Sequence, residues 1–241
     1  TYSFSSYSLE ERVAKNFLYD ETPDVILNIV DASNLKRNLY LSFQLLEIGL
    51  PVVIVLNMTD VAARRGMHID TTKMEALLGC KVVCASGAKG EGAEAIMDAV
   101  FSTYRQKEQD RRFTLHYEAL ESFIQEMKTA IANVDTALNK RWAAIKILEE
   151  DRALIEKLDS DPRRLAEKAQ ACQERFRTAH RQEISAYLAA VRYDSAAIVA
   201  HQCVCLSPKA LKETLTDKVD KIVLNRWLSF PILLLIMVTV Y

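Results

Sequence analysis

Glycine is scarce in this chain of 241 residues and unevenly placed. All six glycines lie between residues 49 and 92. Because glycine often ends helices and forms tight turns, the first hundred residues have the punctuation of an α/β domain, and the rest has almost none. The sequence also lacks the phosphate loop G-x-x-x-x-G-K-[ST]. A phosphate-binding site of that type is therefore not encoded within these residues.

Other absences narrow the class of protein. Basic and acidic residues nearly balance, 31 against 32, so the charge gives no reason to expect a nucleic-acid partner. Five cysteines are an odd number without a disulfide framework, which favours a reducing, cytoplasmic setting. The sequence has no signal peptide and no initiator methionine. We therefore expect a fragment of a longer protein.

A buried strand organises the first part of the chain. Residues 52–56 are consecutive apolar residues, mostly β-branched, with Pro51 before them and a polar turn after them. This pattern is typical of a strand covered on both faces in a parallel α/β sheet. Two more strands are predicted, over residues 24–31 and 81–84. Helices are predicted at 8–19, 35–48, 70–78 and 93–105.

Polar residues follow two of these strands. Asn57 and Asp60 come after the buried strand, and Ser86 opens a glycine-containing loop after the next. Ligands of open α/β sheets bind at the carboxyl ends of the strands. A carboxylate can accept two parallel hydrogen bonds from N1–H and N2–H of guanine, a donor pair that adenine lacks. The pattern predicts a guanine site, unless the two residues merely cap the next helix.

The remainder of the chain has helical periodicity. Apolar residues recur at spacings of three and four, which predicts a helical bundle over residues 111–207. The expected helical runs are 120–138, 142–158, 164–192 and 194–205. His201-x-Cys203-x-Cys205 lies in the last run. This spacing differs from that of structural zinc sites, so small buried helix residues are the preferred interpretation over a metal site.

The last residues change in character. Residues 208–227 are amphipathic and charged, and residues 228–241 carry no charge. The uncharged run is shorter than the roughly 20 residues that span a bilayer. Arg226 and Trp227 stand where an interfacial anchor is usual. We expect a juxtamembrane segment followed by the start of a transmembrane helix, with a buried core helix as the alternative.

These motifs together resemble a known family. Asn57-Met-Thr-Asp60 and Ser86-Gly-Ala-Lys resemble the N-K-x-D and S-A-K guanine-recognition motifs of Ras-like GTPases. The surrounding sequence is similar to that of the FeoB family of bacterial ferrous iron transporters. Two passages carry the similarity, Asp24-Val-Ile-Leu-Asn-Ile-Val-Asp-Ala-Ser-Asn-Leu and Leu215-Thr-Asp-Lys-Val-Asp-Lys-Ile222. The resemblance covers nearly the whole chain and is weakest in the helical middle.

The resemblance implies a fold class of α/β plus all-α. The C-terminal part of a Ras-like GTPase domain would span residues 1–110, and a helical regulatory domain would span 111–207. A juxtamembrane segment at 208–227 and a truncated transmembrane helix at 228–241 would follow. The phosphate loop and first switch would lie upstream, so the fragment itself is expected to be inactive. Residues 1–227 would lie on the cytoplasmic side of the bacterial inner membrane.

The resemblance also implies GTP or GDP as the ligand. Asp60 would accept from guanine, and Asn57 would contact the base edge and join the two loops. Met58 stands in place of the usual lysine and would pack on the ring, and Gly87 replaces the usual alanine. Both changes imply looser nucleotide binding. The full set of base-binding residues would be Asn57, Met58, Thr59, Asp60, Ser86, Gly87 and Ala88.

Further partners follow only from the resemblance. Mg²⁺ and ferrous iron would be bound by the intact protein, and neither a nucleic acid nor a metal site in this chain is implied. The resemblance is also compatible with a homo-oligomer. A competing hypothesis is a soluble helical adaptor whose α/β part is a degenerate, non-binding platform. A ribosome-associated GTPase is a third, which the apolar C-terminal run argues against.

Overall fold

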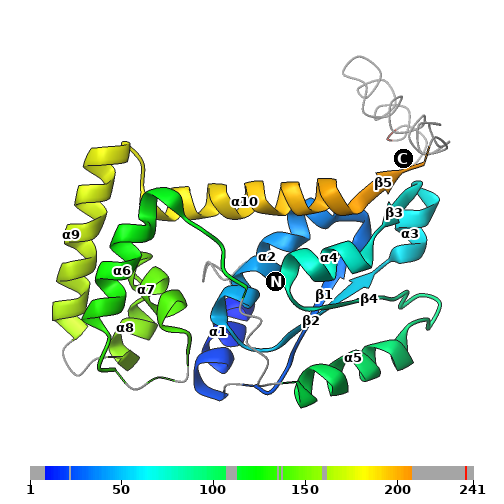
Figure 1. Ribbon diagram of the computed structural model, residues 1–241, viewed down its shortest axis with the longest axis horizontal. Helices are drawn as coiled ribbons and strands as arrows, with labels where there is room; N and C mark the ends of the chain where they lie inside the picture. Colours follow the sequence, from blue (N-terminus) through cyan, green and yellow to red (C-terminus); the bar gives the residue numbers. More distant parts are fainter. Residues whose placement is uncertain are drawn as a thin grey trace.

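The structure is a computed structural model that describes residues 9–21, 23–106, 113–134, 136, 138–158, 162–207 and 237. Strands and helices alternate in the first part of the chain, and helices make up most of the second (Figure 1). Both predicted classes of structure are therefore confirmed. The predicted division of the chain at residues 110, 207 and 227 stays a prediction.

Three parallel strands form the central sheet, in the order β1 (Ile26–Asp31), β2 (Val52–Asn57) and β4 (Lys81–Cys84). All of β2 except its last residue is buried, as its unbroken apolar run predicts. Helix α2 (Leu35–Ile48) packs on one face of the sheet, and helix α5 (Ala93–Arg105) packs on the other (Figure 1).

Side chains on the two faces of β2 pack into two separate hydrophobic cores. Ile54 and Leu56 belong to the large core that includes α2 and continues into the helical part. Val53 and Val55 belong to a small cluster with Ala99 of α5. Since side chains alternate along a strand, one apolar run supplies both faces. Packing on both faces fixes the position of β2, and with it the position of the loop that follows this strand.

Helix ends in this part of the chain follow the sequence signals. Helix α2 stops at Gly49, which has a φ of 87°. Helix α4 (Thr71–Leu78) begins after Asp70, whose carboxylate accepts a hydrogen bond from a backbone N–H of the first turn, and it stops at Gly79 with a φ of 68°. These are the N-cap and left-handed C-terminal positions that aspartate and glycine prefer.

The helical part has more breaks than the periodicity predicts. Its elements are η2 (Glu118–Leu120), α6 (Glu121–Ala130), α7 (Lys140–Leu148), α8 (Arg152–Leu158), α9 (Pro162–His180) and α10 (Ile184–Cys203). The predicted break near residue 193 is wrong. Helix α9 ends instead at Arg181, whose φ of 55° leaves the helical region, and α10 continues through Tyr193, whose ring stacks on Tyr40 of α2 at 4.3 Å.

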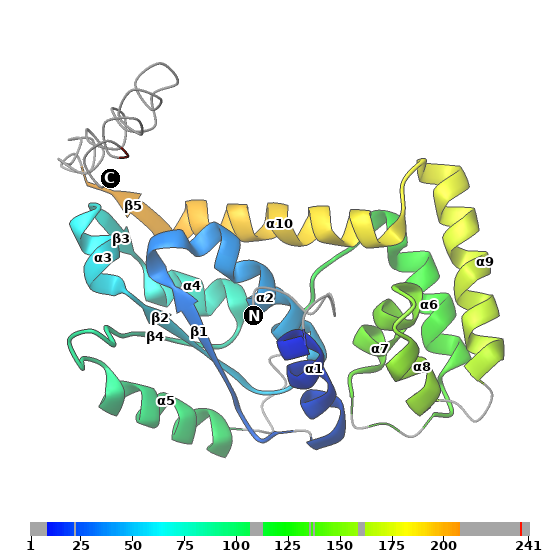
Figure 2. The same ribbon diagram turned by 180° about the vertical axis from the view of Figure 1, so that it is seen from behind.

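The last predicted helical run ends in a strand. Strand β5 (Val204–Leu206) pairs antiparallel with β3 (Met67–Ile69). Backbone hydrogen bonds from Asp70 N to Cys203 O (2.8 Å) and from Ser207 N to Gly66 O (2.7 Å) extend the pairing. Helix α10 runs along α2 and brings β5 to this position (Figure 2). The pairing overturns the prediction that the helix reaches residue 205.

Helix α1 (Leu9–Glu21) contacts the helical part. Lys15 Nζ lies 3.0 Å from Asp151 Oδ2, and Tyr19 Oη donates to the same oxygen at 2.8 Å. The Tyr19 ring also packs edge-on against Trp142 of α7 at 5.3 Å. The two parts of the chain are therefore joined by polar and aromatic contacts as well as by their shared core.

The predicted juxtamembrane and transmembrane segments lie outside the described residues, except for residue 237. Within the described ranges, none of the helices combines the length and the apolar character that a bilayer crossing requires.

Candidate functional site

The loops after β2 and β4 lie side by side, as the sequence predicts. Leu56 pairs with Cys84 across the parallel strands. Ala85 then donates its backbone N–H to Leu56 O at 2.8 Å. Thr59 Oγ1 donates to Ala85 O at 2.9 Å, so the start of helix α3 (Thr59–Arg64) is tied to the second loop. The two sheet strands thus align two short polar segments at one edge.

Asn57 joins the two loops directly. Its Oδ1 accepts a hydrogen bond from the backbone N–H of Gly87 at 2.9 Å. Helix α3 begins after Met58, whose side chain makes no capping hydrogen bond, and Asp60 lies within its first turn. Neither Asn57 nor Asp60 is the N-cap residue of α3. The alternative that these residues serve merely as an N-cap is therefore not what the structure shows.

Asp60 points its carboxylate toward the second loop. Its Oδ1 accepts from Ser86 Oγ at 3.1 Å, and its Oδ2 lies 3.2 Å from Arg64 Nη2. Burial would raise the pKa of Asp60, but the hydrogen bond from Ser86, the Val61 backbone and the nearby Arg64 charge lower it. The carboxylate is thus held ionised, which is the form that accepts two hydrogen bonds.

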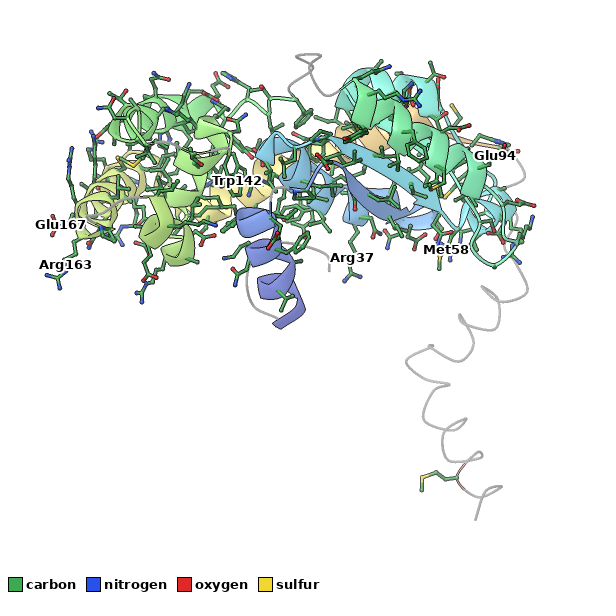
Figure 3. All side chains as sticks on the ribbon, turned by 90° about the horizontal axis from the view of Figure 1, so that it is seen from below. Arg37, Met58, Glu94, Trp142, Arg163 and Glu167 are labelled. Carbon is green, nitrogen blue, oxygen red and sulfur yellow. The ribbon has the colours of Figure 1, made fainter. Side chains whose placement is uncertain are left out.

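Met58 turns the chain from β2 into α3. Its backbone has a φ of 60°, a left-handed conformation that is uncommon for methionine. Its side chain is 47% exposed and lies at the surface of the molecule (Figure 3). An apolar side chain displayed beside an ionised carboxylate can cover one face of a planar ligand while the carboxylate binds its edge.

The second loop is closed on itself. Ser86 N donates to Glu91 O and Glu91 N donates to Ser86 O, both at 3.1 Å. Ser86 is buried, whereas Gly87 and Ala88 are exposed. The loop therefore braces one side chain inward and leaves the backbone of its tip accessible to a ligand.

Gly92 allows this loop to meet the next helix. Its φ is 97°, and a Cβ at this position would lie 2.6 Å from Cys84 O. Gly87 differs, because a Cβ there would meet Asn57 Oδ1 at 3.6 Å, an ordinary contact. Of Gly87 and Gly92, Gly92 is the one that the local geometry requires as glycine.

The His201-x-Cys203-x-Cys205 residues do not gather. Cys203 is buried at the end of α10, and Cys205 is exposed in β5, opposite His68. Across the ranges that the structure describes, no three residues among His, Cys, Asp and Glu are grouped so that they could hold a metal ion.

Comparison with known proteins agrees with this fold. One family model, described as ferrous iron transport protein B, matches residues 1–100, and a second, the FeoB cytosolic helical domain, matches residues 116–205. The chain belongs to the FeoB family. These matches confirm two predictions from the sequence: the resemblance to the FeoB family, and the order of an α/β part followed by a helical part.

Individual FeoB relatives match over most of this chain. It is 35% identical, over 98% of its length, to the Fe(2+) transport protein A/Fe(2+) transporter FeoB fusion protein of Porphyromonas gingivalis, and it spans 29% of that relative. An NFeoB mutant of S. thermophilus bound to GDP matches with a TM-score of 0.77 at 31% identity, covering 84% of this chain and 78% of that one. The mGMPPNP-bound NFeoB from S. thermophilus matches with a TM-score of 0.73 at 30% identity, covering 89% of this chain and 78% of that one.

Two contributors to the site were missed from the sequence. Arg64 pairs with Asp60, and Glu91 closes the second loop through its backbone. The spacing of four residues between Asp60 and Arg64 on one helix was a usable signal, because such pairs face each other. The backbone pairing of Glu91 has no side-chain signal.

Proposed function

We propose that this chain recognises the base of a guanine nucleotide within a GTP-dependent ferrous iron transporter. The observation that carries the proposal is the Asp60 carboxylate at the end of β2, which accepts a hydrogen bond from Ser86 across the two loops at 3.1 Å. Guanine would donate N1–H and N2–H to this carboxylate. Adenine would leave it without that donor pair, which disfavours ATP.

The other predicted residues fit supporting roles. Asn57 accepts the backbone N–H of Gly87 and so fixes the loop tip, where the exposed backbone amide of Ala88 can approach the guanine O6. The Gly87 amide can reach O6 only by leaving Asn57. Thr59 fixes the start of α3 against the second loop. Met58 covers the face of the ring. This arrangement supplies hydrogen bonds to the base edge and an apolar contact to its face.

The relatives support the choice of nucleotide. The two S. thermophilus structures are bound to GDP and to mGMPPNP, and the P. gingivalis relative is an Fe(2+) transporter fusion protein. We propose that GTP hydrolysis, Mg²⁺ binding and Fe²⁺ uptake belong to the whole transporter, in the bacterial inner membrane, with residues 1–227 on the cytoplasmic side. A homo-oligomer is compatible with this proposal.

Base selectivity tests the proposal. Replacing Asp60 with Asn removes the charged acceptor and offers an N–H₂ donor to the 2-oxo group of xanthine. We expect Asp60→Asn to weaken GDP binding about tenfold or more and to improve XDP binding, in titrations displacing a fluorescent mant-nucleotide. Asp98→Asn, an exposed change on α5, is the matched control. Unchanged GDP affinity and selectivity in Asp60→Asn would refute the assignment.

Catalysis is expected to need more than these residues. Because the sequence contains no G-x-x-x-x-G-K-[ST] loop, we expect the 241-residue chain to bind guanine nucleotides weakly and to release no phosphate from GTP. A phosphate-release assay checks this. Sustained turnover by this chain alone would contradict it.

A further inference from the structure

The carboxylate assigned to guanine already has an internal partner. Arg64 Nη2 lies 3.2 Å from Asp60 Oδ2, and the two residues are four apart on α3. The Arg64 side chain is 74% exposed, whereas that of Asp60 is 15% exposed. The guanidinium therefore approaches Asp60 from the solvent side, while Ser86 holds the other oxygen from within the loops.

Arginine and guanine present the same chemistry to a carboxylate. The N1–C2–N2 edge of guanine is itself a guanidine unit, with two roughly parallel N–H donors in one plane. The arginine side chain ends in a planar fork of the same kind. Both are ligands for one acceptor group. Since an exposed ion pair between neighbours on a helix is weak, a bound base can displace the arginine.

We propose that Arg64 sets the affinity and base specificity of the guanine site by competing with the base for Asp60. The inference rests on the function proposed above for Asp60. In the absence of nucleotide the guanidinium occupies Oδ2, and guanine binding requires it to move aside. Arg64 thus lowers guanine affinity and adds to the loose nucleotide binding that the loop sequences imply.

The competition depends on the 2-amino group of the base. Hypoxanthine lacks this group, so it donates only N1–H and engages one carboxylate oxygen. Arg64 can keep the other oxygen when inosine diphosphate binds, but it must release that oxygen to GDP. The native chain is therefore expected to discriminate between GDP and IDP less than a chain without Arg64.

The test measures dissociation constants for GDP and IDP, by displacement of mant-GDP, in the native chain and in two variants. Arg64→Ala should bind GDP about two- to fivefold more tightly. Its IDP affinity should stay unchanged, so the ratio of IDP to GDP constants rises by the same factor. Arg65→Ala removes the same charge at the next, also exposed, residue and should leave that ratio unchanged.

The possible results distinguish a failure of the role proposed for Arg64 from a failure of the proposed guanine site. Two results would overturn the role of Arg64 and leave the proposed function standing. In the first, Arg64→Ala weakens GDP binding. In the second, the ratio of IDP to GDP dissociation constants changes equally in Arg64→Ala and Arg65→Ala. Absence of guanine binding in all three proteins would overturn both. Arg64→Lys provides a further check, because its single ammonium cannot imitate the fork and should give an intermediate ratio.

Discussion

Two polar clusters in this molecule differ in what they leave available. The proposed guanine site lies at the end of β2, with its loop tip exposed and its carboxylate paired to an exposed arginine. The second cluster lies at the junction of α2, α7 and α10. Its members are Glu47, Tyr117, Lys146, Glu149 and Arg192. We call it the buried ion-pair cluster.

The charges of the buried ion-pair cluster are paired with one another, although Arg192 Nη2 is buried without a hydrogen-bond partner among the described residues. Arg192 Nε donates to Glu47 at 2.9 Å, and its Nη1 donates to Glu149 at 3.1 Å. Tyr117 Oη donates to Glu47 at 2.6 Å. Arg192 is 1% exposed. A ligand cannot reach these groups without opening the helix junction.

The contrast between these two clusters shows that a shifted pKa does not by itself indicate a binding site. Burial raises the pKa of Tyr117, and the charges of Glu47 and Glu149 outweigh burial to raise that of Arg192. Shifted pKa values often indicate functional groups. Here they lie in the enclosed cluster that holds the helical part to α2. Asp60 lies beside the exposed loop tip of Gly87 and Ala88 and is the better candidate for ligand binding.

The largest effect is expected from breaking the buried cluster. Arg192→Met leaves the carboxylates of Glu47 and Glu149 buried with fewer partners, which should cost roughly 3–5 kcal/mol of unfolding free energy. Arg163→Met is the matched control, since Arg163 is exposed on α9 (Figure 3) and its loss should change stability by less than about 0.5 kcal/mol. Urea denaturation measures both. Equal stability of the two variants would show that the cluster contributes nothing.

Lowering the pH should also weaken the buried ion-pair cluster, through protonation of Glu149. Burial would raise the pKa of Glu149, but Lys146 and Arg192 outweigh it and lower that pKa to about 2. Because the pKa is lower in the folded state, the stabilisation is complete above about pH 4.5 and is lost as pH falls toward 2. The loss should approach about 3 kcal/mol.

A pair of variants isolates this contribution. The difference in unfolding free energy between the native chain and Glu149→Gln should shrink from pH 6 to pH 3, measured by denaturant titration at each pH. Glu150→Gln, a change at an exposed neighbour, is the matched control. A Glu149→Gln difference that stays constant over this range would argue against the ion pairs as the cause.

The sequence predicted the parts of the fold that local signals determine. The β-branched run of β2 and the glycines at the ends of α2 and α4 have strong local preferences, and the structure follows them. Strand β3 is only three residues long, and its partner β5 lies more than a hundred residues away. No periodicity can be read from so short a strand, and distant pairing leaves no local signal.

The same distinction holds for the site. The two loops could be placed together because parallel strands end at one edge of a sheet. The Asn57–Gly87 and Asp60–Ser86 contacts follow from that placement. The turn at Arg181 and the continuity of α10 could not be predicted, because neither glycine nor proline marks the turn and the stacking of Tyr193 on Tyr40 is a tertiary contact.

The smallest effects should come from the loop glycines, where backbone geometry and not charge decides the outcome. Gly92→Ala places a Cβ against Cys84 O at a φ of 97° and should cost about 2 kcal/mol of unfolding free energy. Gly87→Ala meets only an ordinary contact and restricts the unfolded chain, so it should stabilise by about 0.5 kcal/mol. Thermal and urea denaturation of the two variants measure the contrast. If Gly87→Ala were the more destabilising change, the loop would not have the conformation described, and the tie between Asn57 and Gly87 that positions the site would be in error.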